Sequence, residues 1–221
     1  MYSVWIRDIV SGLAVVTTIF QFLSGIPVCK QYVVRQTTGE ATPLPFICGV
    51  VSTALWLFYG LTKNDYLIVL VNTVGIVLMV VYTAVFYLYT FRKSALLKQI
   101  VVIILILLFV IGYVYTEEDI ELLLNRLGSL ACFLTLLTVA APMSKLLYVI
   151  KVKNTECLPF PMILMSFFVS TLWLLYGLIE EDVFLVLPNF LGAGLALSQL
   201  SLFLVYPSTI QPAVSSKSLI A

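Results

Sequence analysis

The chain has 221 residues, of which 62% are apolar and only 10% are charged, with no histidine and a formal net charge of +1. This composition leaves too little polar surface to cover a water-soluble globule, so it excludes an ordinary soluble domain. We therefore expect an integral membrane protein.

Seven apolar runs follow one another along the chain, and each is long enough to cross a bilayer as a helix, which takes about 20 residues. A membrane barrel would show short alternating segments in place of long apolar runs. The sequence therefore predicts an all-α membrane protein with seven transmembrane helices. The predicted spans are residues 9–29, 44–62, 67–90, 99–115, 128–150, 159–179 and 183–206.

The short polar segments between the spans alternate in the sign of their charge. One set carries nine basic residues and two acidic ones, and the other set carries three basic residues and nine acidic ones. Because Lys and Arg in short loops mark the cytoplasmic side, we predict an N-terminus outside or in the lumen and a C-terminus in the cytoplasm. The nine basic residues are Lys30, Arg35, Arg92, Lys93, Lys98, Lys145, Lys151, Lys153 and Lys217.

The chain also contains one stretch of twenty residues twice. Residues 56–75 and residues 173–192 share ten identities without a gap, at an offset of 117 residues. The shared skeleton is W-x2-Y-G-L-x3-D-x6-N-x2-G, and it includes Trp, Tyr, Asp and Asn, which two unrelated apolar segments would not share by chance. The chain is therefore an internal duplication.

Both copies of this stretch straddle a segment on the predicted outer side, so the two repeats have the same orientation. Two three-helix units of the same orientation must be joined by an odd number of membrane crossings. The run 99–115 has no counterpart elsewhere in the chain and supplies one such crossing. We therefore predict two parallel three-helix bundles joined by a linker helix, a 3+1+3 arrangement. The predicted divisions are the first repeat at 1–97, the linker helix and outer loop at 98–126, the second repeat at 127–207 and a disordered cytoplasmic tail at 208–221.

Prolines recur near the cytoplasmic ends of four predicted helices. Pro27 and Pro142 each precede a lysine by three residues, and a proline pair opens the second helix of each repeat, Pro43 with Pro45 and Pro159 with Pro161. Proline inside a helix removes a backbone donor and kinks the helix, which predicts paired hinges. The alternative is that prolines are common in membrane helices and at helix starts.

Two Trp/Asn pairs at identical spacing are candidates for a binding pocket. Asn72 and Asn189 supply donors and acceptors, and Trp56 and Trp173 supply a flat apolar face with one donor. This combination suits a neutral polyol such as a sugar, and two indoles predict a cavity for a monosaccharide such as glucose and not a disaccharide. The alternative is that each Asn joins helices and each Trp belongs to the interfacial belt.

The sequence lacks the residues that proton coupling, catalysis, metal binding or phosphate binding would need. No charged side chain falls securely at the centre of a predicted span, so there is no evident carrier for a coupled proton, and downhill transport fits better than proton symport. No nucleophile with its base, metal cluster or phosphate loop is recognisable. We expect no catalytic residue, no metal, no cofactor and no nucleic-acid partner, and therefore not an enzyme.

The duplication, the prolines and the W-x2-Y-G-L segments resemble the SWEET family of sugar transporters, within the PQ-loop group, from about residue 9 to 206. The PQ dipeptide of that group reads Pro-Val and Pro-Met here. The resemblance implies bidirectional facilitative transport by alternating access, a homo-oligomer, and a plasma-membrane or Golgi location. By the family's motifs, the hinge prolines of the inner gate fall on Pro27, Pro45, Pro142 and Pro159, the substrate-binding residues on Asn72, Asn189, Trp56 and Trp173, and the outer gate on Tyr59, Tyr176, Lys63 and Asp182.

Two other functions fit parts of the pattern. A carrier of amino acids or another small metabolite from the PQ-loop group would share the fold and mechanism. A seven-helix receptor would share the topology but would not be duplicated internally, and the outer loops here are short.

Overall fold

A computed structural model describes residues 4–140 and 143–208, and within these ranges the chain is helical apart from short turns. Seven stretches in the described residues are long and apolar enough to cross a membrane. The helices are α1 (Val4–Leu23), α2 (Gly25–Arg35), α3 (Leu44–Lys63), α4 (Tyr66–Tyr89), α5 (Lys93–Thr116), α6 (Ile120–Ala140), α7 (Met143–Val152), α8 (Phe160–Ile179) and α9 (Val183–Val205).

Several helices extend beyond the apolar runs that predicted them. The first span continues from Val4 to Arg35 through α1 and α2, and α5 begins at Lys93, six residues before the predicted start at 99. Lys and Arg are good helix formers, so the helix continues past the hydrocarbon into the charged flanks. The hydropathy pattern therefore marks the part of each helix that suits the bilayer, and the whole helix is longer.

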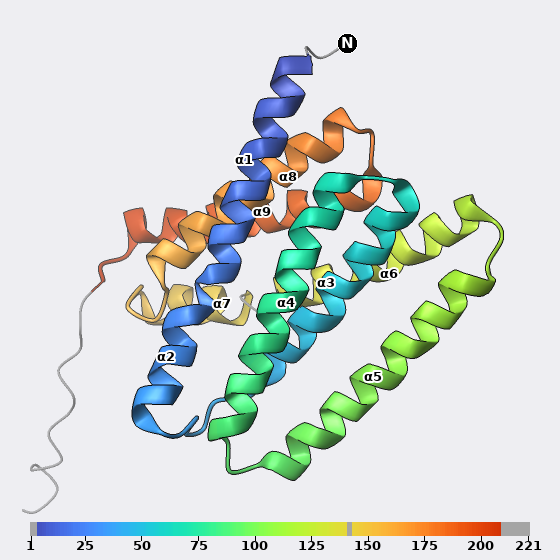
Figure 1. The fold of residues 1–221 in the computed structure, drawn as a ribbon. Helices are drawn as coiled ribbons and strands as arrows, with labels where there is room; N and C mark the ends of the chain where they lie inside the picture. The colour runs from blue at the N-terminus through green and yellow to red at the C-terminus, as the bar shows by residue number, and fades with distance from the viewer. Residues whose placement is uncertain (1–3, 141–142, 209–221) are drawn as a thin grey trace, which may run out of the picture.

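The packing repeats between the two halves of the chain. The α3–α4 and α8–α9 pairs are tight hairpins, α4 also packs against α1, and α9 also packs against α6 (Figure 1). The halves meet through α1 with α8 and through α3 with α6, while α5 crosses between them and packs on α3. This is the predicted 3+1+3 arrangement of two parallel three-helix bundles and a linker helix.

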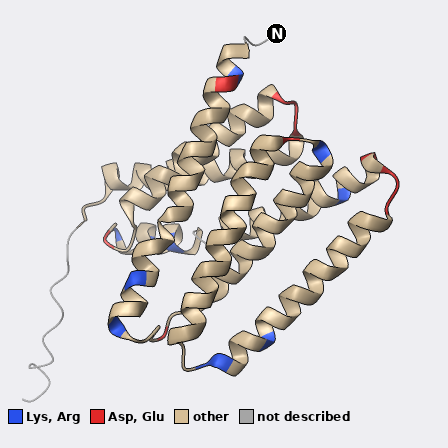
Figure 2. Cartoon of the chain, viewed as in Figure 1, with Lys and Arg blue, Asp and Glu red and all other residues tan. Residues whose placement is uncertain are grey.

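The charged residues gather at the two ends of the bundle (Figure 2). We call the end that holds the α3–α4 and α8–α9 turns the acidic end, and the end that holds the α4–α5 and α7–α8 turns the basic end. Acidic residues cluster at the acidic end, in the α5–α6 and α8–α9 turns, whereas the α4–α5 turn at the basic end carries Arg92 and Lys93.

Both hairpins at the acidic end are built in the same way. Asp65 and Asp182 cap α4 and α9, because Oδ1 of each accepts two backbone N–H groups of the first helical turn at 3.0–3.2 Å. A Cβ atom added at Gly60 would lie 3.1 Å from the backbone nitrogen of Val69 in α4. One added at Gly177 would lie 3.1 Å from the backbone nitrogen of Val186 in α9. The two glycines therefore let each hairpin close tightly.

Candidate functional site

Two tyrosines cross between the repeats and bind the aspartate that begins the last helix of the other repeat. The Tyr59 hydroxyl donates to Asp182 Oδ2 at 2.7 Å, and the Tyr176 hydroxyl donates to Asp65 Oδ2 at 2.8 Å. All four residues are buried. Both the tyrosines and the aspartates are 117 residues apart, so the two hydrogen bonds are equivalent by the internal repeat.

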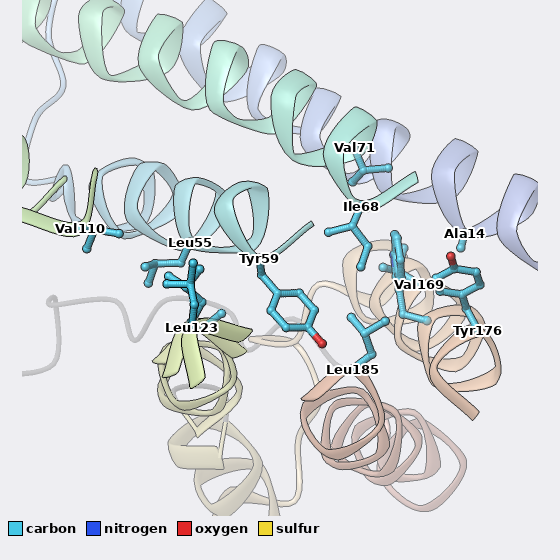
Figure 3. Close-up of a cluster of buried hydrophobic side chains, with 13 residues drawn as sticks. Ala14, Leu55, Tyr59, Ile68, Val71, Val110, Leu123, Val169, Tyr176 and Leu185 are labelled. Carbon is cyan, nitrogen blue, oxygen red and sulfur yellow. The ribbon is translucent and has the colours of Figure 1, made fainter. Parts of the chain in front are cut away.

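The tyrosines belong to the main hydrophobic core of the protein. In the view of Figure 3, Ile68 and Leu185 lie between the two rings. Ile68 and Leu185 are themselves 117 residues apart and are almost fully buried. Apolar packing and the two tyrosine–aspartate bonds together join the repeats at the acidic end.

The charges around the two tyrosine–aspartate pairs are not symmetric. Lys63 Nζ contacts Asp182 Oδ2, and the Asp182 side chain is only 2% exposed. The residue 117 positions after Lys63 is Glu180, whose Oε1 pairs with Arg7 Nε at 2.5 Å. In the part of the chain that the structure describes, no Lys or Arg forms an ion pair with Asp65. A cation thus neutralises one of the two equivalent aspartates and not the other.

A second pair of equivalent hydrogen bonds lies one turn further into the bundle. Trp56 Nε1 donates to Thr135 Oγ1 at 3.0 Å, and Trp173 Nε1 donates to Thr18 Oγ1 at 2.8 Å. The threonines are again 117 residues apart and lie on α1 and α6, the first helix of each repeat. Each Trp ring also meets the next-turn tyrosine of its own helix edge to face, with ring centroids 5.6 Å apart. We call these four residues the Trp–Thr layer.

A cavity of about 500 Å³ lies on the basic-end side of the Trp–Thr layer, between α1 and the helices of the second repeat. The Gln21 side-chain amide donates to Ser166 Oγ at 3.1 Å and joins α1 to α8 at its wall. No carboxylate is among the described residues that line it. The polar lining residues are Gln21, Thr138, Lys145, Ser166, Ser170 and Gln199.

Helix periodicity connects the cavity to the predicted binding residues. Residues three apart on a helix lie on one face, one turn from each other. Four lining residues, one on each of α1, α6, α8 and α9, therefore have a neighbour on the same face one turn closer to the acidic end. The four lining residues are Gln21, Thr138, Ser170 and Gly192, and their neighbours are Thr18, Thr135, Trp173 and Asn189.

The predicted asparagines lie at equivalent places in the two repeats. Asn72 Nδ2 donates to the Ile68 carbonyl and Asn189 Nδ2 donates to the Leu185 carbonyl, both at 2.8 Å. Each carboxamide keeps its oxygen and its second N–H for another partner. Neither asparagine lines the cavity in this conformation, and neither do Trp56 and Trp173. Trp173 and Asn189 lie one helical turn from the lining residues Ser170 and Gly192, toward the acidic end.

The two repeats differ in side-chain size at one position beside the cavity. A Cβ atom added at Gly75 would lie 2.8 Å from Phe22 Cε2. At Gly192, 117 residues later, the equivalent neighbour is Val139, at 3.8 Å. Phe22 and Val139 are also 117 residues apart, so an aromatic ring in the first repeat stands where the second repeat has a smaller side chain.

The predicted hinge prolines occupy different positions relative to their helices. Pro27 lies in α2, directly after the break between α1 and α2. Pro45 is the second residue of α3, a place that proline tolerates, and its equivalent by helix position is Pro161. Pro159 precedes α8 as its N-cap and lines the cavity. Pro142 lies outside the described residues.

Sequence reasoning missed several residues of these contacts. Asp65 belongs to the repeated skeleton, as Asp182 does, but only Asp182 was singled out for the gate. Thr18 and Thr135 lie in a weaker repeat of the first helix, Leu-Ala-x3-Thr, at the same offset of 117 residues. That shared offset is the signal that pairs Thr18 with Thr135.

Comparisons with known proteins agree with this architecture. The model of a family described as "Sugar efflux transporter for intercellular exchange" matches twice, over residues 8–94 and 125–211. "Sugar transporter SWEET1" of Drosophila pseudoobscura pseudoobscura is 41% identical over 203 residues, which cover 90% of this chain and 89% of that protein. The protein of the same name from Xenopus tropicalis is 32% identical, and the match covers 94% of this chain and 97% of that protein. The one from Homo sapiens is 29% identical, and the match covers 92% of each chain.

A solved structure of a eukaryotic SWEET transporter has the same fold. It superposes with a TM-score of 0.81 over 90% of this chain and 97% of that one, at 24% sequence identity. The double family match and the relative at 41% identity extend over nearly the whole length of the seven helices. The chain therefore belongs to the SWEET family of sugar efflux transporters and is a multi-pass membrane carrier, not an enzyme.

Proposed function

We propose that this protein is a uniporter that carries a monosaccharide such as glucose in both directions by alternating access. The observation that carries the proposal is a cavity with six polar lining residues next to the Trp–Thr layer, where equivalent residues of both repeats meet. The acidic end faces the outside or the lumen, and the basic end faces the cytoplasm, since Lys and Arg concentrate on the cytoplasmic side. In this orientation the two tyrosine–aspartate bonds hold the repeats together on the outer side, which supports an outer gate that is closed.

The lining of the cavity suits a neutral polyol. Gln21, Thr138 and the two lining serines offer donors and acceptors for hydroxyl groups, and the surrounding apolar side chains can cover C–H faces. The volume of about 500 Å³ falls within the roughly 300–1,000 Å³ range of small-molecule sites. An amino acid needs a fixed partner for its carboxylate and one for its ammonium group, and the lining supplies only Lys145.

None of the four predicted binding residues lines the cavity in this conformation, so the sugar reaches them when the Trp–Thr layer opens. Asn189 and Trp173 belong to the second repeat, and Asn72 and Trp56 present the same groups from the first. In the closed layer both indole N–H groups are occupied by threonine hydroxyls. A sugar hydroxyl that takes over the indole N–H releases the threonine, so binding loosens the contact between the repeats and favours opening to the outside.

Opening to the outside also requires separation of the outer gate. This gate comprises Tyr59, Tyr176, Lys63 and Asp182, with Asp65 as the fifth member. The prolines near the basic end supply the movement of the inner gate. The protein forms a homo-oligomer in the plasma membrane or the Golgi, as the family resemblance implies.

Purified protein in liposomes tests this function. We expect exchange of labelled glucose between the two sides without a pH gradient, and no accumulation when a gradient is imposed. Labelled sucrose and labelled amino acids serve as controls and should not exchange. Accumulation of glucose driven by a pH gradient would exclude uniport, and exchange of amino acids in place of glucose would assign the other substrate class.

A further inference from the structure

A second hollow lies on the side of the molecule that faces the lipid, between α4 and α5. It has a volume of about 540 Å³, and Ile47 and Val50 of α3 form its floor. In Figure 1, α5 runs apart from α4. Because α5 packs on α3 and makes little contact with α4, side chains of both α4 and α5 line the groove. Five residues of α5 line the groove, and together they form one stripe along the helix: Leu97, Ile100, Ile103, Ile104 and Leu107.

The lining of this groove is almost entirely apolar. Among its lining residues only Thr83 and Tyr87 carry a polar side-chain atom, and the Thr83 hydroxyl already donates to the Met79 carbonyl at 2.8 Å. A polar ligand would lose hydrogen bonds to water there without replacement, whereas a hydrocarbon chain has none to lose. From Leu97 to Leu107, α5 rises about 15 Å, which is half of a hydrocarbon core of roughly 30 Å. The groove therefore matches one leaflet in length.

Basic residues stand at the mouth of the groove, at the basic end of the bundle. Lys93 lies one turn before Leu97 on the same stripe of α5, and its Nζ is 5.6 Å from the centroid of the Tyr87 ring. Within the described residues Lys93 forms no ion pair, and Arg92 meets only the exposed Glu40, at 3.4 Å. The mouth is therefore positively charged, with one ammonium group held over a residue of the groove wall.

We propose that this groove binds one anionic phospholipid, with an acyl chain between α4 and α5 and the phosphate group at Lys93 and Arg92. Anionic lipids are concentrated in the cytoplasmic leaflet, so the site rests on the orientation proposed above. A second copy of the chain in the same orientation fits less well. Most of its acidic residues lie at the opposite end of the bundle, so it would bring few carboxylates to this mouth (Figure 2).

The thermal unfolding midpoint of the purified full chain in detergent tests the site. Phosphatidylserine and phosphatidylcholine with the same acyl chains are added separately, and soluble glycerophosphate is added as the headgroup without chains. We expect a rise in the midpoint of several degrees with phosphatidylserine, a smaller rise with phosphatidylcholine, and none with glycerophosphate. Equal shifts with the two lipids, or an equal shift with glycerophosphate, would overturn the proposal.

Variants separate the two parts of the site. Lys93→Gln should remove the difference between the two lipids, whereas Lys151→Gln, the same charge change on the exposed α7, should keep it. Ala84→Phe places a ring in the groove from an exposed position and should abolish stabilisation by both lipids, with the helical circular dichroism unchanged. Retained lipid selectivity in Lys93→Gln contradicts the site. If lipid has no effect on the parent and Ala84→Phe changes the mass of the oligomer, the groove binds a second copy of the chain instead of a lipid.

Glucose exchange by the same variants distinguishes a failure of the lipid site from a failure of the proposed transport function. Neither Lys93 nor Ala84 lines the cavity between α1 and the second repeat. Both variants should therefore exchange glucose in liposomes of phosphatidylcholine at the rate of the parent. If the parent shows lipid selectivity but no glucose exchange, the lipid site stands and the proposed function falls.

Discussion

Tyr59 and Asp182 are 123 residues apart in the chain, yet the tyrosine hydroxyl donates to the aspartate Oδ2 at 2.7 Å and joins the two repeats at the acidic end. The same bond occurs between Tyr176 and Asp65 at 2.8 Å. Among the described residues, only the first aspartate also contacts a cation, Lys63. The proposed outer gate thus consists of two equivalent hydrogen bonds, of which only the one to Asp182 has a lysine beside its carboxylate in the described part of the chain.

The first prediction concerns these two bonds. Tyr59→Phe and Tyr176→Phe each remove one hydroxyl and leave the ring in the core, and a hydrogen bond to a charged group contributes about 1.5–3 kcal/mol. Both variants should populate the outward-open state more than the parent. The measurement is the reaction rate of Leu67→Cys with an impermeant thiol reagent, in a chain whose four natural cysteines are replaced by serine.

The two tyrosine variants should differ in degree. Asp65 forms no ion pair with a Lys or Arg among the described residues, so Tyr176→Phe leaves that carboxylate with its helix cap alone. Tyr176→Phe should therefore accelerate the thiol reaction more than Tyr59→Phe. Asp182→Ala should also accelerate it, but it removes the cap of α9 as well, which costs about 1 kcal/mol of stability. Unchanged rates in all three variants would leave the gate unsupported.

The second prediction concerns the Trp–Thr layer. Thr18→Val and Thr135→Val keep the shape of the side chain and remove the acceptor for one indole N–H. Each should weaken closure by about 1 kcal/mol, the net contribution of a typical hydrogen bond, which corresponds to a several-fold faster thiol reaction. Thr17→Val is the control, because Thr17 is only partly buried and its hydroxyl donates to the backbone carbonyls of Leu13 and Ala14 within α1. A control that reacts as fast as Thr18→Val would contradict the role of the layer.

The third prediction concerns the asparagines. Asn72→Ala and Asn189→Ala should each lower the rate of glucose exchange at subsaturating sugar by about five- to a hundredfold, as expected for a lost hydrogen bond of about 1–3 kcal/mol to a buried hydroxyl. Unfolding in detergent should change little, since each amide bonds only within its own helix. Parental exchange rates in both variants would show that the pocket lies elsewhere.

The fourth prediction concerns size selection. Phe22→Val makes the first repeat resemble the second, in which Val139 is the equivalent residue, and should extend the cavity toward Gly75. We expect measurable sucrose exchange in addition to glucose exchange. The comparison is the double variant Trp56→Ser and Trp173→Ser, which removes two indoles from the same region. Sucrose exchange by the unaltered protein would contradict the proposed selectivity.

The fifth prediction concerns stability. Gly60→Ala and Gly177→Ala place a Cβ about 3.1 Å from the backbone of the next helix, and overpacking of this kind typically costs about 1–3 kcal/mol. Gly12→Ala on α1 has no neighbour within 4 Å and should be neutral or slightly stabilising. Unfolding midpoints of the three variants test the difference. A midpoint for Gly60→Ala equal to that of Gly12→Ala would contradict the close approach of α3 and α4.

Much of the architecture follows from local patterns in the chain. Apolar runs of the length of a bilayer predict helices because only a helix satisfies its backbone hydrogen bonds within one segment in hydrocarbon, whereas a barrel strand needs neighbouring strands. The repeated stretches at 56–75 and 173–192 then predict two parallel units. The apolar run at 99–115, which has no counterpart in either unit, predicts the linker helix. These inferences depend only on composition, period and repetition, which the chain carries in order.

The contacts between the repeats depend on three-dimensional packing. The pairing of Tyr59 with Asp182, and of Trp173 with Thr18, joins residues more than 120 positions apart, and nothing local in either segment names the partner. The space beside Gly75 and Gly192 likewise depends on how side chains such as Phe22 and Val139 pack at a helix crossing. By itself the sequence determined the number, order and repetition of the helices, because each helix satisfies its hydrogen bonds within its own segment. The tertiary structure decided which polar groups meet between the repeats and where space remains, because both depend on how the two bundles dock.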